Sequence, residues 1–117
     1  MCHVLVIEDD ALAAEDIRGV LSHAGASSFS FADTEREALA CARGQRPEVI
    51  VSDVMLSTGF GPVAVQAICA ELGAIPTIFV TGTPDQCSGC DPDYVLEKPF
   101  SPHRLETLFR SVAPPAV

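Results

Sequence analysis

The sequence predicts an α/β fold in which a parallel sheet lies between two layers of helices. Short apolar runs typical of strands alternate along the chain with segments whose apolar residues recur at helical spacing. Consecutive parallel strands are joined by right-handed crossovers, which place helices on both faces of the sheet. The length of 117 residues fits one domain with its own core. We therefore expect residues 1–117 to form a single domain that ends in a short tail, residues 113–117.

Five strands are expected, at residues 4–7, 28–32, 49–51, 77–80 and 94–96. The first is the continuous apolar run Val-Leu-Val-Ile, which is typical of a strand buried on both faces. The second alternates phenylalanine with serine and is a weaker strand signal.

Helices are expected at residues 11–24, 34–42, 62–72 and 102–112. In the first, apolar residues follow the helical period and Gly25 provides the stop. Thr34 and Glu37 have the spacing of a capping box, and Ser101 and Pro102 supply an N-cap and an N1 proline. The crossover at residues 82–93 is short and holds two prolines and two glycines, so little more than one helical turn is expected there.

The composition narrows the function and the location. The net charge is −9 with only seven basic residues, which argues against binding to nucleic-acid phosphates. No apolar run approaches the roughly 20 residues needed to span a bilayer. The first ten residues lack the pattern of a signal peptide. A cytoplasmic location without membrane attachment is therefore expected, with all five cysteines as reduced thiols.

Two cysteines in the segment TPDQCSGCDPD raise the alternative of a zinc or dithiol site. Zinc requires four ligands, and only Cys87 and Cys90 lie close together in the sequence. The neighbouring aspartates disfavour the thiolate that a redox dithiol needs. A solvated loop is the favoured interpretation. The three histidines, at positions 3, 23 and 103, share no spacing and are expected at the surface.

Polar side chains gather where the predicted strands end. Glu8, Asp9 and Asp10 follow the first strand, and Asp53 follows the third. Asp10 is interpreted as a helix N-cap. Because parallel sheets of this class bring their strand ends together at a ligand site, Asp9 and Asp53 should repel one another unless a cation lies between them. Mg²⁺ prefers such oxygen ligands.

Four motifs in order, VLVIEDD, VIVSDVML, FVTG and EKPF, resemble those of the receiver domain of two-component response regulators, over nearly the whole chain. The resemblance implies a flavodoxin-like, doubly wound sheet with strand order 2-1-3-4-5 in three layers. It implies that Asp53 is the phosphoacceptor and that Mg²⁺ is held by Glu8, Asp9, Asp53 and the backbone carbonyl of Met55.

The same resemblance assigns roles at the later strands. Thr81 would hydrogen-bond the phosphoryl group, Lys98 would pair with it, and the Lys98–Pro99 peptide would be cis. The partner would be a histidine kinase or a histidine phosphotransfer protein. The chain would act as a signalling module rather than an enzyme, and it is expected to stand alone without an output domain. The oligomeric state stays open, a homodimer included.

The chain also departs from the family pattern. Val95 occupies the position where an aromatic residue often reports activation, and Ser57 stands where a proline is often found. The motif Phe-x-Thr-Gly resembles an atypical receiver subgroup, although Thr83 replaces an aromatic residue. The alternative is a pseudo-receiver that binds partners without phosphorylation, with a zinc or redox role for the CxxC loop. A flavin-binding domain is disfavoured, because acidic residues replace the phosphate loop after the first strand.

Overall fold

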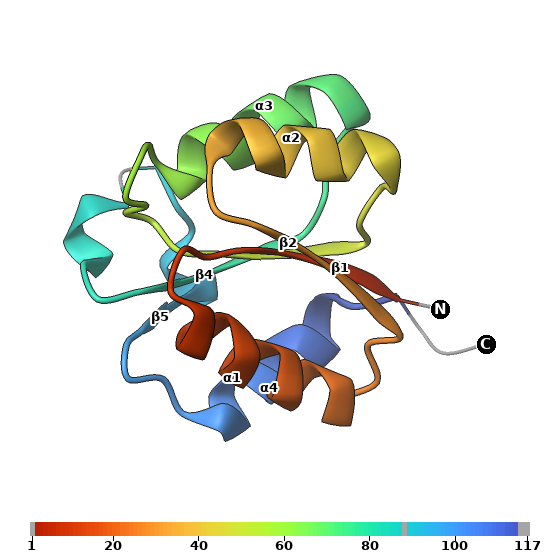
Figure 1. Ribbon diagram of the computed structural model, residues 1–117. Helices are drawn as coiled ribbons and strands as arrows, with labels where there is room; N and C mark the ends of the chain where they lie inside the picture. The colour runs from red at the N-terminus through yellow and green to blue at the C-terminus, as the bar shows by residue number, and fades with distance from the viewer. Residues whose placement is uncertain (1, 88, 115–117) are drawn as a thin grey trace.

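The computed structural model describes residues 2–87 and 89–114, and its strands form one parallel sheet (Figure 1). The strand order is β2-β1-β3-β4-β5, which confirms the predicted doubly wound topology. The five strands are β1 (His3–Ile7), β2 (Ser28–Ala32), β3 (Val49–Ser52), β4 (Thr77–Thr81) and β5 (Val95–Glu97). The central strands β1 and β3 are buried along their whole length, as their uninterrupted apolar sequences predict.

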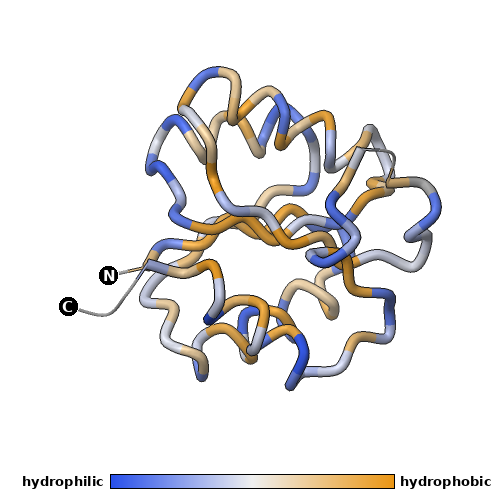
Figure 2. Tube along the Cα trace, turned by 180° about the vertical axis from the view of Figure 1, so that it is seen from behind, coloured by the Kyte–Doolittle hydropathy of each residue, from blue (hydrophilic) through white to orange (hydrophobic). Residues whose placement is uncertain are grey.

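Two helices cover each face of the sheet. Helices α1 (Ala11–His23) and α4 (Pro102–Val112) pack on one face, and α2 (Glu35–Gly44) and α3 (Gly61–Leu72) pack on the other (Figure 1). Each face has its own apolar cluster, and the strands between them form the hydrophobic centre of the molecule (Figure 2). Among the described residues, no helix is both long and apolar enough to cross a membrane.

The helix ends follow the predicted capping residues. Asp10 accepts a hydrogen bond from the backbone of Leu12, and Ser101 caps α4 in the same manner. Thr34 accepts from the backbone N–H of Glu37, but the Glu37 carboxylate accepts from the N–H of Asp33 instead of completing the reciprocal bond to Thr34. The capping box is therefore present in one direction only.

The crossover between β4 and β5 contains no α-helix among its described residues. Two short 3₁₀ turns, η1 (Pro84–Gln86) and η2 (Pro92–Tyr94), stand in its place, in line with the short segment that the prolines predict. The prediction that Tyr94 begins the fifth strand is wrong. Asp91 caps η2 and accepts the N–H of Tyr94, so the strand starts at Val95.

Two other predictions are corrected. Cys87 and Cys90 are joined in a disulfide and are not free thiols. The disulfide leaves neither sulfur as a thiolate for zinc. His3 is buried rather than exposed, because its ring nitrogens pair with the hydroxyls of Ser28 and Ser30 on the neighbouring strand, at 2.7 and 2.8 Å. Burial lowers the pKa of His3.

Candidate functional site

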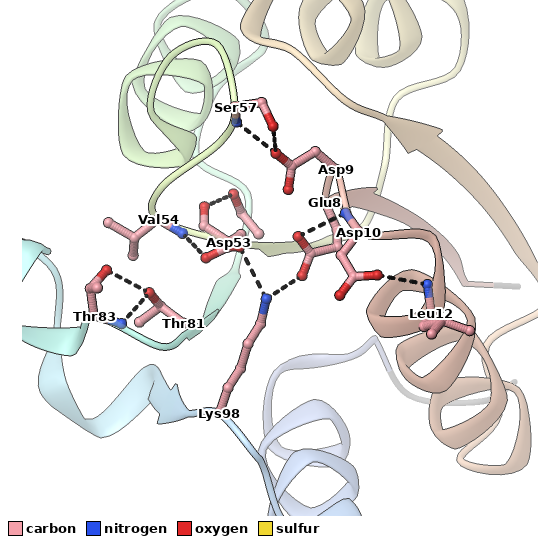
Figure 3. Close-up of polar contacts among 11 residues, drawn as sticks. Glu8, Asp9, Asp10, Leu12, Asp53, Val54, Ser57, Thr81, Thr83 and Lys98 are labelled. Carbon is pink, nitrogen blue, oxygen red and sulfur yellow. Dashed lines mark hydrogen bonds and ion pairs between the residues drawn. The ribbon is translucent and has the colours of Figure 1, made fainter.

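Three carboxylates meet at the carboxyl ends of β1 and β3. Ile7 and Ser52 are register partners at the ends of these adjacent parallel strands, so the residues that follow them emerge side by side. One ligand oxygen each of Glu8, Asp9 and Asp53 lies within 4.8 Å of the others (Figure 3). The predicted acidic cluster is therefore assembled by strand order and register.

Lys98 reaches this cluster from the end of β5, a strand at the edge of the sheet. It follows β5, and its Nζ atom lies 2.5 Å from Oε1 of Glu8 and 3.0 Å from Oδ2 of Asp53 (Figure 3). Its backbone N–H donates to the carbonyl of Thr81, and its peptide bond to Pro99 is cis, as predicted. One ammonium thus pairs with two carboxylates from two strands.

Burial and neighbouring charge change the acidity of the cluster. Burial raises the pKa of Glu8 to about 7, and the charge of Asp53 adds to the rise while Lys98 opposes it. Burial alone would lower the pKa of Lys98, but its hydrogen bonds to Glu8 and Asp53 outweigh that effect and raise it. Ionisation of Glu8 is therefore costly in the folded protein.

This cost predicts a pH trend in the metal-free protein. The folded pKa of Glu8 is about 7 against an ordinary value of 4.5, so its contribution to stability is fully present below pH 4.5 and is lost as pH rises through 7. Glu8→Gln cannot ionise. Its free energy of unfolding should therefore rise relative to the wild type by about 1–3 kcal/mol across this range.

Chemical denaturation with a chelator at a series of pH values measures this difference. The change of this difference with pH is what tests the prediction. A change in the hydrogen bond to Lys98 would instead shift the unfolding free energy of Glu8→Gln by the same amount at every pH. Glu15→Gln removes an exposed carboxylate whose pKa is lowered by Arg18, and it should not reproduce the trend. Parallel profiles for Glu8→Gln and the wild type would contradict the prediction.

Asp53 is held rigidly on a crowded backbone. It is 8% exposed, and its Oδ1 atom accepts from the N–H of Val54 at 2.7 Å. Its backbone N–H donates to the carbonyl of Ile7, and its own carbonyl accepts from the hydroxyl of Ser52. Gly61 approaches this carbonyl so closely that a Cβ atom would collide with it and with the Ser52 hydroxyl. Glycine is required there by space.

Gly61→Ala should lower the free energy of unfolding by about 1–3 kcal/mol, because the backbone at Asp53 must shift to admit a methyl group. Gly19→Ala is the matched control. Gly19 lies inside α1 with nothing within 4 Å of an added Cβ, so this change should stabilise by about 0.5–1 kcal/mol. Thermal and denaturant unfolding measure both variants. Equal effects of the two substitutions would show that the contact at Asp53 is unimportant.

The two remaining predicted site residues, Thr81 and Met55, differ in the contacts that they make. Thr81 is fully buried, and its hydroxyl is engaged with the N–H and hydroxyl of Thr83, at 3.0 and 3.1 Å, on the adjoining loop. Met55 forms an isolated antiparallel bridge with Phe60. The backbone hydrogen bonds beside this bridge are made by other residues, and the Met55 carbonyl accepts none of them.

Ser57 is a site neighbour that the motif comparison did not identify. Its backbone N–H donates to Oδ2 of Asp9 at 2.6 Å, and its hydroxyl donates to the same oxygen (Figure 3). These bonds hold the pKa of Asp9 below its usual value, against the raising effect of partial burial. The only sequence signal was that Ser57 stands where the family often has proline.

The donor set fits Mg²⁺. Carboxylate oxygens are the ligands that this ion prefers, and the site is open enough on the Asp9 side to admit water. With all three carboxylates ionised, Lys98 leaves two negative charges unbalanced, which a divalent cation would neutralise.

The structure is an α/β module with an acidic cluster at the carboxyl ends of its parallel strands, and comparison with known proteins identifies its family. The response regulator receiver domain model matches residues 4–110, so the chain belongs to that family. It is 28% identical over 109 residues to the phyllosphere-induced regulator PhyR of Methylorubrum extorquens, covering 90% of this chain and 41% of that protein. It is 35% identical over 121 residues to the probable transcriptional regulator ycf27 of Porphyridium aerugineum, covering 93% and 47%.

A solved structure shows the same architecture. The PhyR receiver domain of Erythrobacter litoralis superposes with a TM-score of 0.86 at 25% identity, covering 99% of this chain and 96% of that one. The chain thus matches an isolated receiver domain in full, while it spans less than half the length of the two curated relatives.

Proposed function

We propose that the chain is a phosphoacceptor module of two-component or phosphorelay signalling, in which Asp53 takes a phosphoryl group from a phosphohistidine with Mg²⁺ bound. The observation that supports this most strongly is the position of the Asp53 carboxylate. It follows β3, lies close to the two carboxylates that follow β1, and is reached by Lys98. A structural ion pair would not need this surplus of negative charge.

Transfer would join a carboxylate oxygen of Asp53 to phosphorus while the bond from phosphorus to the imidazole nitrogen of the donor breaks. The nitrogen keeps the electron pair of that bond and takes up a proton. The bond from Val54 to Oδ1 and the bond from Lys98 to Oδ2 orient the attacking carboxylate. Lys98 then lies close enough to pair with the transferred group, and the buried Thr81 hydroxyl would join it after releasing Thr83.

Glu8, Asp9 and Asp53, with the backbone carbonyl of Met55, would hold the Mg²⁺ ion. When bound, the ion supplies positive charge that stabilises the equatorial oxygens of the transferring phosphoryl group. Burial raises the pKa of Glu8, so Glu8 would act through water, and the hydrogen bonds from Ser57 lower the pKa of Asp9, so Asp9 would be the direct ligand.

The donor would be a histidine kinase or a histidine phosphotransfer protein, and the chain would act as a signalling switch rather than as an enzyme. Its net charge of −9 favours a partner surface with basic character and disfavours direct contact with nucleic acid. Residues up to Val112, where α4 ends, would form the complete receiver module.

Acetyl phosphate replaces the protein donor in the test. We expect intact-mass analysis to show one added phosphoryl group with acetyl phosphate and Mg²⁺, and none when a chelator removes the metal. A protein that stays unlabelled at saturating Mg²⁺, or that is labelled equally in the chelator, would contradict the proposal and favour a pseudo-receiver.

A further inference from the structure

In the loop between β3 and α3, Ser57 joins the chain to Asp9 of the acidic cluster. Ser57 directs two donors, its backbone N–H and its hydroxyl, at the same oxygen, Oδ2 of Asp9. Asp9 is the carboxylate of the cluster that Lys98 does not contact: the ammonium pairs with Glu8 and Asp53. The Asp9 carboxylate is therefore stabilised by hydrogen bonds from the loop instead of by the ammonium.

Further hydrogen bonds within and beside the loop hold the turn that contains Ser57. Leu56 donates to the carbonyl of Gly59 at 3.1 Å and closes a tight turn that contains Ser57. Gly59 has φ +108°, a backbone conformation that favours glycine. On the far side of the turn, the carboxylate of Glu35, at the start of α2, accepts the N–H of Phe60 at 2.8 Å. Asp9, which follows β1, and Glu35, at the start of α2, thus hold the turn from two sides.

We propose that Ser57 is a positioning residue of the metal site: it holds Oδ2 of Asp9, which would leave the other oxygen of this carboxylate for a cation, and it thereby couples cation binding to the β3–α3 loop. This rests on the proposed function in so far as the cation site is the one described there. Where a metal ligand is held by hydrogen bonds to its second oxygen, loss of those bonds weakens binding, because the carboxylate must then be ordered by the metal itself.

The two donors can be removed one at a time. Ser57→Ala removes the hydroxyl and keeps the N–H, whereas Ser57→Pro, which introduces the residue often found in the family, removes both. Ser57→Thr keeps both and serves as the conservative rescue. Thr58→Ala is the matched control, since Thr58 is an exposed neighbour whose hydroxyl makes no hydrogen bond within the described part of the chain.

Calorimetric titration with MgCl₂ measures the affinity of each variant. We expect Ser57→Ala to weaken Mg²⁺ binding by about tenfold and Ser57→Pro by more, up to about a hundredfold. Ser57→Thr and Thr58→Ala should bind as the wild type does. In the wild type, the amide NMR signal of Ser57 should shift on Mg²⁺ addition, and in Ser57→Ala the maximal labelling rate should recover at saturating Mg²⁺.

Several outcomes would overturn the inference. Equal Mg²⁺ affinity of the wild type and Ser57→Ala, an equal loss in Thr58→Ala, or a wild type that binds no Mg²⁺ would each do so. The two proposals fail separately. If Ser57→Ala weakens Mg²⁺ binding while acetyl phosphate leaves the wild type unlabelled, the positioning role stands and the phosphoacceptor function falls. If the wild type is labelled but Ser57→Ala binds Mg²⁺ normally, the reverse holds.

Discussion

Asp53→Asn should abolish labelling by acetyl phosphate completely. The asparagine amide has the shape of the carboxylate and can still accept the hydrogen bond from the N–H of Val54, so the fold around position 53 should persist. Its neutral amide offers no carboxylate nucleophile, and no other carboxylate of the cluster shares the contacts to both Val54 and Lys98. Intact-mass analysis after incubation with acetyl phosphate and Mg²⁺ measures the effect directly.

Asp10→Asn is the matched control for that experiment. Asp10 is adjacent to the cluster in sequence, but its side chain caps α1 by accepting from Leu12. Asparagine is as good an N-cap as aspartate, so this variant should fold normally and label like the wild type. Residual labelling of Asp53→Asn would place the phosphoacceptor on another residue, and loss of labelling in Asp10→Asn would show that the effect is not specific to position 53.

Most of the fold could be predicted because its determinants are local and periodic. The uninterrupted apolar run of β1 indicated a strand covered on both faces, and the caps at Asp10, Thr34 and Ser101 indicated where helices start. Breaker residues in the β4–β5 crossover predicted little more than one helical turn there, and the described residues of the crossover form no α-helix. The strand order itself came from family resemblance, since periodicity alone does not distinguish one order of parallel strands from another.

What the sequence did not reveal at His3 and Ser57 has one physical cause, which is contact between residues distant in sequence. His3 is buried because β2 lies beside β1 and supplies two serine hydroxyls in register with its ring. A lone histidine in an apolar segment does not reveal such partners. Ser57 likewise appeared as an ordinary loop residue until the fold brought it to Asp9, 48 positions away. The strand-end carboxylates and Lys98 were predictable, whereas Ser57, which orients Asp9, was not.

Lys98→Met should have the second large effect, because Lys98 is the only lysine of the chain and the only cation paired with the cluster within the described residues. Methionine keeps much of the apolar stem and removes the ammonium. In metal-free buffer the variant leaves the carboxylates unbalanced. Breaking a fully buried pair costs about 3–5 kcal/mol. The Lys98 side chain is 26% exposed, so solvent screening should reduce the loss in unfolding free energy to about 1–3 kcal/mol.

Labelling should be affected even where Mg²⁺ restores stability. The ammonium lies 3.0 Å from the Asp53 carboxylate, where it would meet charge that develops on the phosphoryl oxygens, and removing one such preorganised donor costs about 10²-fold or more in rate.

Arg104→Met is the control, since it removes an exposed cation on α4 away from the cluster. The rate of acetyl phosphate labelling at saturating Mg²⁺ and the unfolding free energy with and without Mg²⁺ measure both effects. If Lys98→Met is labelled as fast as Arg104→Met, Lys98 acts only as a structural counter-ion to Glu8 and Asp53. The other outcome is that Lys98→Met is labelled slowly and gains more stability from Mg²⁺ than the wild type does. It would show that the ammonium both balances the charge of the cluster and assists the phosphoryl transfer.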